Sequence, residues 1–363
     1  MNRVILFTIP HLYGGGAERV VSLWASQLAQ TRRYDVPILV SGRVSAEYAV
    51  DENVTISSIS PTYEDYEKLS LLTKLRRRRF LLKQINPDYV VSFLPHIQIQ
   101  TFLATIGLKT KRVETIRVSP WVIRLGGINR ALWNLCINTC HALILQTPEQ
   151  GLFFSSRVQK KSIVIPNPIN GLYNQSFKHG QSECVQSFMA VGRITSQKNY
   201  TMMIRAFAKV HRHNPNITLD IFGSVESQEY KVAIEDLIHS LGLENNVRLC
   251  GRSNNIHEEY IKHDAFLMSS DFEGMPNSLL EAMVCGMVCL STNCKTGPKD
   301  MIEHGDSGFL VQVDNVDAFA NGIEHILQIS QAERQLMGER ARKKIIAMCS
   351  PENTLKQLIR IFE

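Results

Sequence analysis

The sequence contains no hydrophobic run that approaches the roughly 20 apolar residues of a membrane span. Its amino terminus, MNRVILFTIPHLYGGG, passes from a short apolar stretch directly into glycines, where a signal peptide would have a small-residue cleavage site. We therefore expect a cytoplasmic protein without a membrane anchor.

The cysteine spacings of a disulfide framework or a zinc site are also absent. None of the eight cysteines belongs to a CxxC pair, and several lie inside apolar stretches. Cys285, Cys289 and Cys294 are clustered, but no histidine stands nearby at ligand spacing. This pattern predicts reduced core cysteines and no metal site.

A dinucleotide-binding fingerprint is missing as well. An apolar strand over residues 4–9 leads into Gly14, Gly15 and Gly16, and apolar residues then recur at helical spacing over residues 20–30. The glycines are not spaced as GxGxxG, which argues against an NAD-dependent dehydrogenase. A tight turn explains one glycine well and three poorly. Backbone N–H groups at a helix start favour an anion, so we predict a ligand-binding loop.

Positive charge exceeds negative charge by six, and much of it falls in one segment. From Lys74 to Lys83, six of ten residues are Lys or Arg, interleaved with leucines and a phenylalanine. Such an amphipathic helix either lies on an anionic membrane surface, where each cation contributes roughly 1 kcal/mol, or presents a solvated face. Both interpretations stay open. Nucleic acid is disfavoured, because no binding motif accompanies the patch.

Length and hydrophobic pattern predict two α/β domains. The chain has 363 residues, of which 44% are hydrophobic, and this suits roughly two domains. Apolar strands alternate with helices in both halves. Pro166 and Pro168 stiffen one connection, so we place the boundary there. The domains are then residues 1–170, joined by a C-terminal helix over 350–363, and residues 171–349.

Four charged residues of the second half are candidates for a ligand site, because they lie in loops or early in a helix. Arg193 and Lys198 flank the turn between a strand and a helix, where two cations beside a helix N-terminus form a good diphosphate site. Residues 265–290 form a strand, polar loop, helix and strand, a βαβ unit. Glu273 lies in its loop and Glu281 early in its helix, eight residues apart, so the loop must bring the two carboxylates together.

The motifs occur in one order along nearly the whole chain: GGGAERV, QTPEQ, IPNP, VGRITSQKNY, SSDFEGMPNSLLEAM and GPKDMI. This series resembles a family 4 retaining glycosyltransferase, in particular the bacterial enzymes that build surface polysaccharides or lipid-linked oligosaccharides. The resemblance implies the GT-B fold, in which two Rossmann-like domains face each other across a cleft. The first domain would then serve the acceptor and the second would bind a nucleotide sugar.

The same resemblance assigns roles in binding the donor. It implies that Glu273 meets the sugar hydroxyls, that Glu281 holds the ribose, and that Arg193 and Lys198 neutralise the diphosphate. Further donor-binding residues would be Gly15, Gly16, Met275, Pro276, Asn277 and Ser278.

Three residues of the first half complete the implied site. His96 follows a buried strand and would line the sugar site as a catalytic residue, although a lone histidine there is as often structural. Glu18 and Arg117 would contact the acceptor. Arg117 is carried over only weakly, because relatives often have Glu-Arg where this chain has Ile116 and Arg117.

The implied function is transfer of a sugar, with retention, from a UDP-sugar or a GDP-sugar to a glycan or lipid-linked acceptor. The cations would take the place of a metal, so no metal or other cofactor is expected. The location would be cytoplasmic, peripheral on the inner face of the membrane. Two alternatives stay open: a nucleotide-sugar epimerase or hydrolase of the same fold, and a non-catalytic carbohydrate-binding partner subunit.

Overall fold

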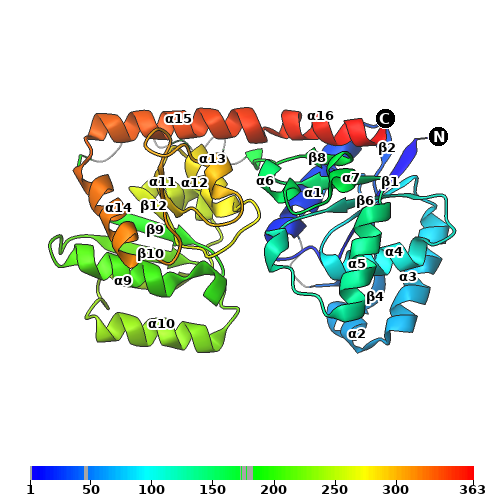
Figure 1. Cartoon of the computed structure of the whole chain (residues 1–363), viewed down its shortest axis with the longest axis horizontal. Helices are drawn as coiled ribbons and strands as arrows, with labels where there is room; N and C mark the ends of the chain where they lie inside the picture. The colour runs from blue at the N-terminus through cyan, green and yellow to red at the C-terminus, as the bar shows by residue number, and fades with distance from the viewer. Residues whose placement is uncertain (1, 45–47, 172, 174–176, 178–182) are drawn as a thin grey trace. The chain divides into compact units, whose positions relative to one another are not determined.

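The computed structural model describes residues 2–44, 48–171, 173, 177 and 183–363. The chain forms two compact units, seen in Figure 1. Unit 1 comprises Met1–Pro168 and Pro351–Glu363, and unit 2 comprises Ile169–Ser350. No helix in the described part of the chain is long and apolar enough to cross a membrane.

Unit 1 is built on a parallel sheet with the strand order β4-β3-β1-β5-β6-β7-β8, and the short β2 pairs with β1. The strands are β1 (Arg3–Ile9), β2 (Tyr34–Asp35), β3 (Ile38–Arg43), β4 (Ile56–Thr62), β5 (Tyr89–Ser92), β6 (Lys111–Thr115), β7 (Ala142–Leu145) and β8 (Ser162–Val164). The helices are α1 (Gly16–Gln30), α2 (Tyr63–Lys68), α3 (Leu71–Ile85), α4 (Pro95–Thr105), α5 (Gly127–Thr139), α6 (Pro148–Gly151), α7 (Ser156–Gln159) and α16 (Pro351–Phe362).

Unit 2 has a second parallel sheet, with the order β11-β10-β9-β12-β13-β14. Its strands are β9 (Ser187–Val191), β10 (Thr218–Phe222), β11 (Val247–Gly251), β12 (Ala265–Met268), β13 (Val288–Thr292) and β14 (Phe309–Val311). Its helices are α9 (Tyr200–His211), α10 (Gln228–Ser240), α11 (Ile256–Lys262), α12 (Asn277–Val284), α13 (Pro298–Met301), α14 (Val316–Gln328) and α15 (Gln331–Cys349). The predicted βαβ unit is thus β12, α12 and β13.

Both sheets reverse their direction of winding once. The reversal lies between β1 and β5 in unit 1 and between β9 and β12 in unit 2. In open α/β sheets, ligands bind beyond the carboxyl ends of the strands at this switch point. The loops that follow these four strands are therefore the places where each unit is expected to hold a ligand.

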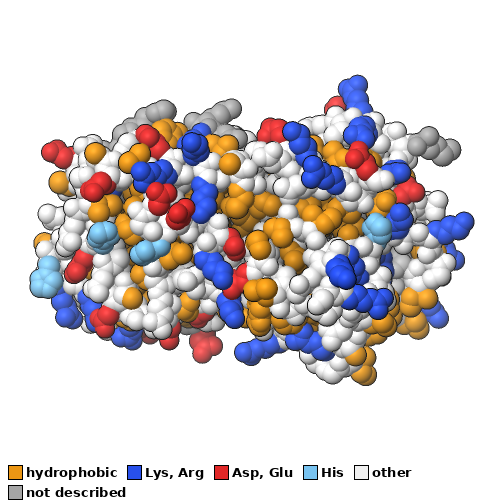
Figure 2. All heavy atoms as spheres, turned by 45° about the horizontal axis from the view of Figure 1, so that its top comes forward, with side chains coloured by type: hydrophobic (Ala, Val, Ile, Leu, Met, Phe, Trp, Pro, Cys, Tyr) orange, Lys and Arg blue, Asp and Glu red, His pale blue; other side chains and the backbone are white. Residues whose placement is uncertain are grey.

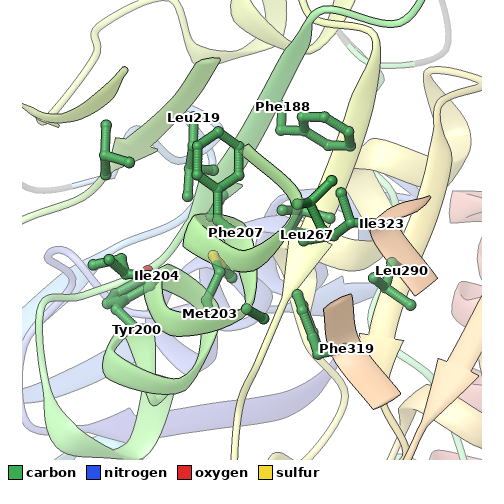
Figure 3. Packing of buried hydrophobic residues seen from close by; sticks show 14 of the residues in the cluster. Phe188, Tyr200, Met203, Ile204, Phe207, Leu219, Leu267, Leu290, Phe319 and Ile323 are labelled. Carbon is green, nitrogen blue, oxygen red and sulfur yellow. The ribbon is translucent and has the colours of Figure 1, made fainter. Parts of the chain in front are cut away.

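Each sheet is covered by helices that present apolar side chains. Figure 3 shows part of the core of unit 2, where Phe207 of α9 and Phe319 of α14 lie against Phe188, Leu219 and Leu267 of the sheet. In unit 1 the C-terminal helix α16 contributes Leu358, Ile361 and Phe362 to the core around β1 and α1. The last helix of the chain therefore completes the hydrophobic core of the first unit.

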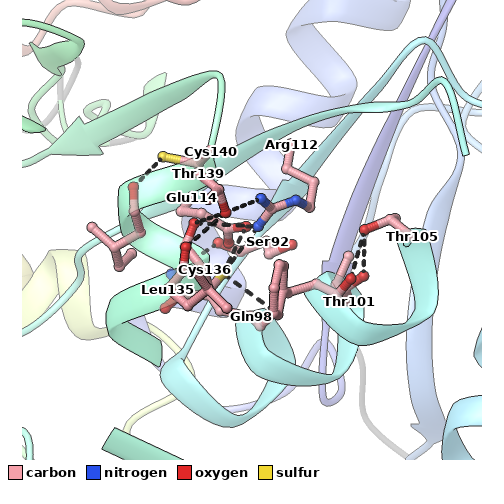
Figure 4. Close-up of polar contacts among 12 residues, drawn as sticks. Ser92, Gln98, Thr101, Thr105, Arg112, Glu114, Leu135, Cys136, Thr139 and Cys140 are labelled. Carbon is pink, nitrogen blue, oxygen red and sulfur yellow. Dashed lines mark hydrogen bonds and ion pairs between the residues drawn. The ribbon is translucent and has the colours of Figure 1, made fainter. Parts of the chain in front are cut away.

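A buried polar network fixes the start of α4 against the sheet of unit 1 (Figure 4). Gln98 donates to Thr115 O (2.7 Å) and accepts from Trp133 Nε1 (2.7 Å). Nearby, the fully buried Glu114 contacts Cys136 Sγ and Arg112 Nη1, each at 3.2 Å. Burial raises the pKa of Glu114 to about 7. The network positions the two corners of the sheet that carry His96 and Arg117.

One cation of the basic helix α3 lies in the protein interior, whereas the sequence pattern predicted all of them on the surface. Arg78 is fully buried and donates to Thr8 Oγ1 of β1 (2.7 Å), whereas Leu72 and Phe80 are 57% and 60% exposed. The amphipathic pattern treated every arginine as a surface residue, but Arg78 faces polar atoms of the sheet. On the face seen in Figure 2, Lys and Arg side chains lie among Asp and Glu side chains.

Candidate functional site

Hydrogen bonds join the two switch-point loops of unit 2. After β9, Gln197 donates its side-chain amide to Phe272 O (2.8 Å) and its carbonyl accepts from Asp271 N (2.9 Å). Asn199 adopts a left-handed conformation, caps α9 and donates to Asp271 Oδ1 (2.8 Å). Ser269 donates to Lys198 O (2.7 Å). The loop that carries the predicted cations is therefore fastened to the loop that carries Glu273.

Lys198 and Glu273 meet at the centre of these loops. The Lys198 Nζ lies 2.6 Å from Glu273 Oε1, and the two side chains are only 13% and 10% exposed. The hydroxyl of Ser270 donates to the same carboxylate oxygen (2.8 Å). The backbone of Glu273 is also held, since its N–H donates to Lys295 O (3.0 Å). The cation and the carboxylate predicted for the donor site are thus direct neighbours.

Glu281 lies in α12 and is 5% exposed. Its Oε2 accepts a hydrogen bond from the hydroxyl of Tyr260 (3.0 Å), which is fully buried and also donates to Ser278 O. Burial and the nearby Glu281 raise the pKa of Tyr260 well above its ordinary value, so this hydroxyl remains a donor. Met275 and Pro276 are buried just before α12, and Pro276 has no N–H with which to bind a ligand.

Arg193 stands apart from the ion pair in this structure. Its guanidinium contacts Glu226 at 2.6 Å, and both side chains are about half exposed. Exposed pairs of this kind contribute about 0–1 kcal/mol, so a phosphate oxygen would replace Glu226 at little cost. Of the predicted donor-binding set, the structure therefore brings Lys198 and Glu273 into contact and leaves Arg193 on a different partner.

The glycine loop of unit 1 leads into α1, which begins at Gly16 rather than at Val20, where the apolar periodicity starts. Gly15 is the N-cap residue, and the carboxylate of Glu18 folds back over it. A Cβ on Gly15 would lie 2.0 Å from Glu18 Oε2, so any other residue there requires the end of the Glu18 side chain to move. An acidic residue in the first turn also suits the positive end of a helix.

His96 is the second residue of α4, at the carboxyl end of β5. Partial desolvation and then the charge of Arg78 lower its pKa, which favours the neutral imidazole. Two residues earlier, Leu94 has a φ of +68°, which is unusual for a residue with a side chain. Such conformations cluster at functional sites. Because His96 is exposed at the turn from β5 into α4, its side chain is accessible to a ligand.

Arg117 follows β6 at the same edge of the sheet. Its guanidinium lies 4.5 Å from the Trp24 ring and 4.9 Å from the Phe93 ring, and it donates to Asn167 Oδ1 (3.2 Å). Burial lowers its pKa to about 9. Sequence patterns favoured Arg117 only weakly, whereas in the structure its guanidinium contacts two aromatic rings.

The sequence reasoning missed three residues that shape the donor loops. Ser270 stands three residues before Glu273, and this spacing was its only signal. Tyr260 reaches Glu281 from the preceding helix, α11, and Asn199 ties the two loops together. Neither has a sequence signal of its own, because their roles depend on which strands are neighbours.

Solved structures of the same architecture establish the fold. HepE of Anabaena, determined in complex with UDP and glucose, superposes with a TM-score of 0.80 at 17% identity, over 99% of this chain and 98% of that chain. Sucrose-phosphate synthase of Thermosynechococcus elongatus superposes with a TM-score of 0.83 at 16% identity, over 99% and 98%. The prediction of a GT-B fold with two parallel α/β units is confirmed.

Sequence comparison identifies the family. The family model described as "Glycosyl transferases group 1" matches residues 174–344. The N-acetylgalactosamine-N,N'-diacetylbacillosaminyl-diphospho-undecaprenol 4-alpha-N-acetylgalactosaminyltransferase of Campylobacter jejuni is 31% identical over 344 residues, which cover 90% of this chain and 91% of that protein. An uncharacterized glycosyltransferase of Haemophilus influenzae is 24% identical over 357 residues, or 95% and 98%. The chain belongs to the group 1 glycosyl transferases.

Proposed function

We propose that this glycosyltransferase moves a sugar from a UDP-sugar, with retention of configuration and without a metal, to a glycan or lipid-linked acceptor of a bacterial surface polysaccharide. Two similarities support this choice of substrates. HepE was solved with UDP and glucose, and the name of the Campylobacter relative includes a diphospho-undecaprenol carrier.

One observation carries the proposal: the contact of 2.6 Å between Lys198 and Glu273. The two side chains come from the loops after β9 and β12, the two strands at the switch point. A nucleotide sugar needs a cation near its phosphates and a hydrogen-bond acceptor near its sugar hydroxyls. Both groups must lie close to the sugar–phosphate bond that breaks. An adjacent lysine and glutamate meet both.

Charge separation explains how these residues would promote the reaction. As the bond between sugar and phosphate breaks, negative charge grows on the departing UDP and positive character grows on the sugar. Lys198 faces the first charge, and Arg193 would join it after leaving Glu226. Fixed charges in a site of low exposure stabilise such a transition state by several kcal/mol. Because two cations serve the diphosphate, we propose that no metal is required.

The stereochemistry follows from the role given to Glu273. This carboxylate is paired with Lys198 and Ser270, so we assign it to the sugar hydroxyls rather than to attack on the anomeric carbon. The acceptor then enters on the face that the phosphate leaves. The departing phosphate oxygen takes the proton of the acceptor hydroxyl, and the anomeric configuration is retained.

The proposal is tested with the full chain and a panel of UDP-sugars and GDP-sugars. Thermal shift identifies the donor, since a ligand at one hundred times its dissociation constant stabilises the folded state by about 2.7 kcal/mol. NMR of the product reports its anomeric configuration. Full transfer by a Glu273→Gln variant, or loss of transfer on adding a chelator, would contradict the scheme.

An incubation without acceptor separates transfer from the alternatives. Rapid conversion of a labelled UDP-sugar to an epimer or to free sugar would favour an epimerase or hydrolase. A chain that bound neither UDP nor any nucleotide sugar would instead behave as a carbohydrate-binding subunit. The presence of the Lys198 and Glu273 pair supports an enzyme over a carbohydrate-binding subunit.

We also propose that unit 1 contacts an anionic membrane surface through α3. The exposed side of this helix carries Leu71, Leu72, Arg76, Phe80 and Lys83. Apolar side chains would enter the interface while each cation contributes about 1 kcal/mol. Sedimentation with phosphatidylglycerol vesicles tests this contact.

We expect the Phe80→Glu variant to bind these vesicles at least about tenfold more weakly than the wild type, because it exchanges an inserted ring for a like charge. Leu152→Glu is the matched control, since Leu152 is 74% exposed elsewhere in unit 1. Equal binding by both variants would contradict the contact.

A further inference from the structure

Two motifs of the sequence, QTPEQ and IPNP, have no part in the donor site, and the structure joins them. Gln146 of the first motif donates its side-chain amide to Asn167 Oδ1 of the second (2.8 Å). The same oxygen accepts from Arg117 Nη1 (3.2 Å). These residues follow the ends of β7, β8 and β6, three adjacent strands of unit 1. They form what we call the Arg117 cluster.

The cluster contains polar atoms that are buried without a hydrogen-bond partner in the described part of the chain. They are Arg117 Nε and Nη2, Gln146 Oε1 and, two residues after Arg117, Ser119 Oγ. Most buried polar atoms in proteins are paired, and each unpaired one costs about 1–3 kcal/mol. Several such atoms on one linked group of residues indicate a site that a ligand completes.

The unpaired nitrogens of Arg117 belong to one edge of the guanidinium. Nε–H and an N–H of Nη2 point the same way and form the fork that binds carboxylates and phosphates. Arg248 shows this pairing within the same protein, since its Nε and Nη2 lie 2.7 and 2.6 Å from the two oxygens of Asp220. In Arg117 the same two nitrogens are buried and have no hydrogen-bond partner among the described residues.

Among the described residues, no carboxylate forms an ion pair with Arg117. Its guanidinium lies over Trp24 and Phe93, and burial lowers its pKa. A purely structural cation at such a depth is normally paired. A neutral ligand would satisfy the nitrogens but leave this charge buried, whereas an anion satisfies both needs.

We propose that the acceptor carries an anionic group, a carboxylate or a phosphate, which binds the open Nε and Nη2 edge of Arg117. Gln146 Oε1 then accepts a hydrogen bond from a hydroxyl of the same molecule. The proposal rests on the proposed glycosyl transfer, because unit 1 is taken as the acceptor side. It goes further in making the acceptor acidic and in giving the QTPEQ and IPNP motifs a role.

NMR of the full chain labelled with [15N]arginine observes this edge directly. The Arg117 Nε–H signal is assigned by its absence in the Arg117→Lys variant. The chain is titrated with methyl phosphate, with methyl glucuronide as the carboxylate, and with methyl glucoside as the neutral match. We expect one or both anions to shift the Arg117 signal to saturation. The anion that does so shows whether the acceptor group is a phosphate or a carboxylate. The glucoside should leave it unchanged.

Arg248 serves as an internal control, because Asp220 already fills the corresponding edge. Its Nε–H signal should stay in place throughout the titrations. No shift of Arg117 with either anion, an equal shift with the glucoside, or a parallel shift of Arg248 would overturn the proposal.

For transfer to an acidic acceptor, we expect Arg117→Lys to raise the KM of that acceptor at least about tenfold, since lysine keeps the charge but loses the fork. An unchanged KM would also overturn the proposal. A thermal-shift measurement of UDP binding to the wild type tests the proposed function separately. If UDP binds and no anion reaches Arg117, only the present inference fails.

Discussion

Breaking the pair of Lys198 and Glu273 should cost far more stability than breaking a surface pair of the same length. The side chains are 13% and 10% exposed, so a Lys198→Met change leaves a largely buried carboxylate with the Ser270 hydroxyl as its remaining side-chain donor. Removing one partner of a buried pair costs about 3 kcal/mol or more of unfolding free energy. The matched control is Lys231→Met. Lys231 also lies 2.6 Å from its partner, Glu235, but in an exposed pair worth about 0.3–0.5 kcal/mol.

The measurement is urea unfolding followed by far-UV circular dichroism. Fluorescence would be uninformative about unit 2, because all three tryptophans, Trp24, Trp121 and Trp133, lie in unit 1. Lys198→Met, Glu273→Gln and the double variant complete a cycle, for which we expect a coupling of about 2 kcal/mol. Additive single effects, or a loss under about 1 kcal/mol for Lys198→Met, would refute the buried contact. In transfer assays, Lys198→Met should lower kcat by about a hundredfold or more, as for other residues that stabilise transition-state charge.

Three further outcomes are expected. Folding raises the pKa of Glu114 from 4.5 to about 7, so its carboxyl loses its proton at a lower pH in the unfolded chain. The unfolding free energy should therefore fall by up to about 3 kcal/mol as pH rises from 4.5 to about 7. In urea titrations at several pH values, Glu114→Gln should abolish this fall. Tyr260→Phe leaves the buried Glu281 without its hydroxyl donor, so UDP binding should weaken about tenfold in calorimetry while the circular dichroism spectrum is unchanged. Gly15→Ala puts a poorer N-cap residue at the start of α1 and requires the flexible end of Glu18 to move, so the melting temperature should fall by a few degrees, for a cost of about 0.5–1 kcal/mol.

The strands and the loops of the donor site could be predicted from the sequence for a physical reason. Parallel strands are buried on both faces, so they appear as continuous apolar runs such as β12 (Ala265–Met268) and β13 (Val288–Thr292). Polar and glycine-rich segments between such runs must lie at the edges of the sheet. The order of the motifs then predicted which edge binds the donor.

Side-chain partners could not be predicted, because they depend on the order of the strands. Arg193 contacts Glu226, which follows the neighbouring strand β10, 33 positions further along the chain. Periodicity also misplaced one charge of α3, that of Arg78. A helix pattern assigns arginine to the surface, yet Arg78 is buried and donates to Thr8 Oγ1. In both cases the partner is brought close only by the assembled sheet.

In the proposed donor site, Lys198 and Glu273 hold each other in place as an ion pair. Without Lys198, the largely buried Glu273 carboxylate would keep the Ser270 hydroxyl as its one side-chain donor among the described residues. In the proposed complex, phosphate oxygens replace Glu273 around Lys198, and sugar hydroxyls replace Lys198 around Glu273. Each charge exchanges one partner for another, so neither is left buried and unpaired. Phosphate alone would satisfy only the lysine, and sugar alone only the glutamate. The site therefore favours a ligand that presents both groups at once, and this is the defining feature of a nucleotide sugar.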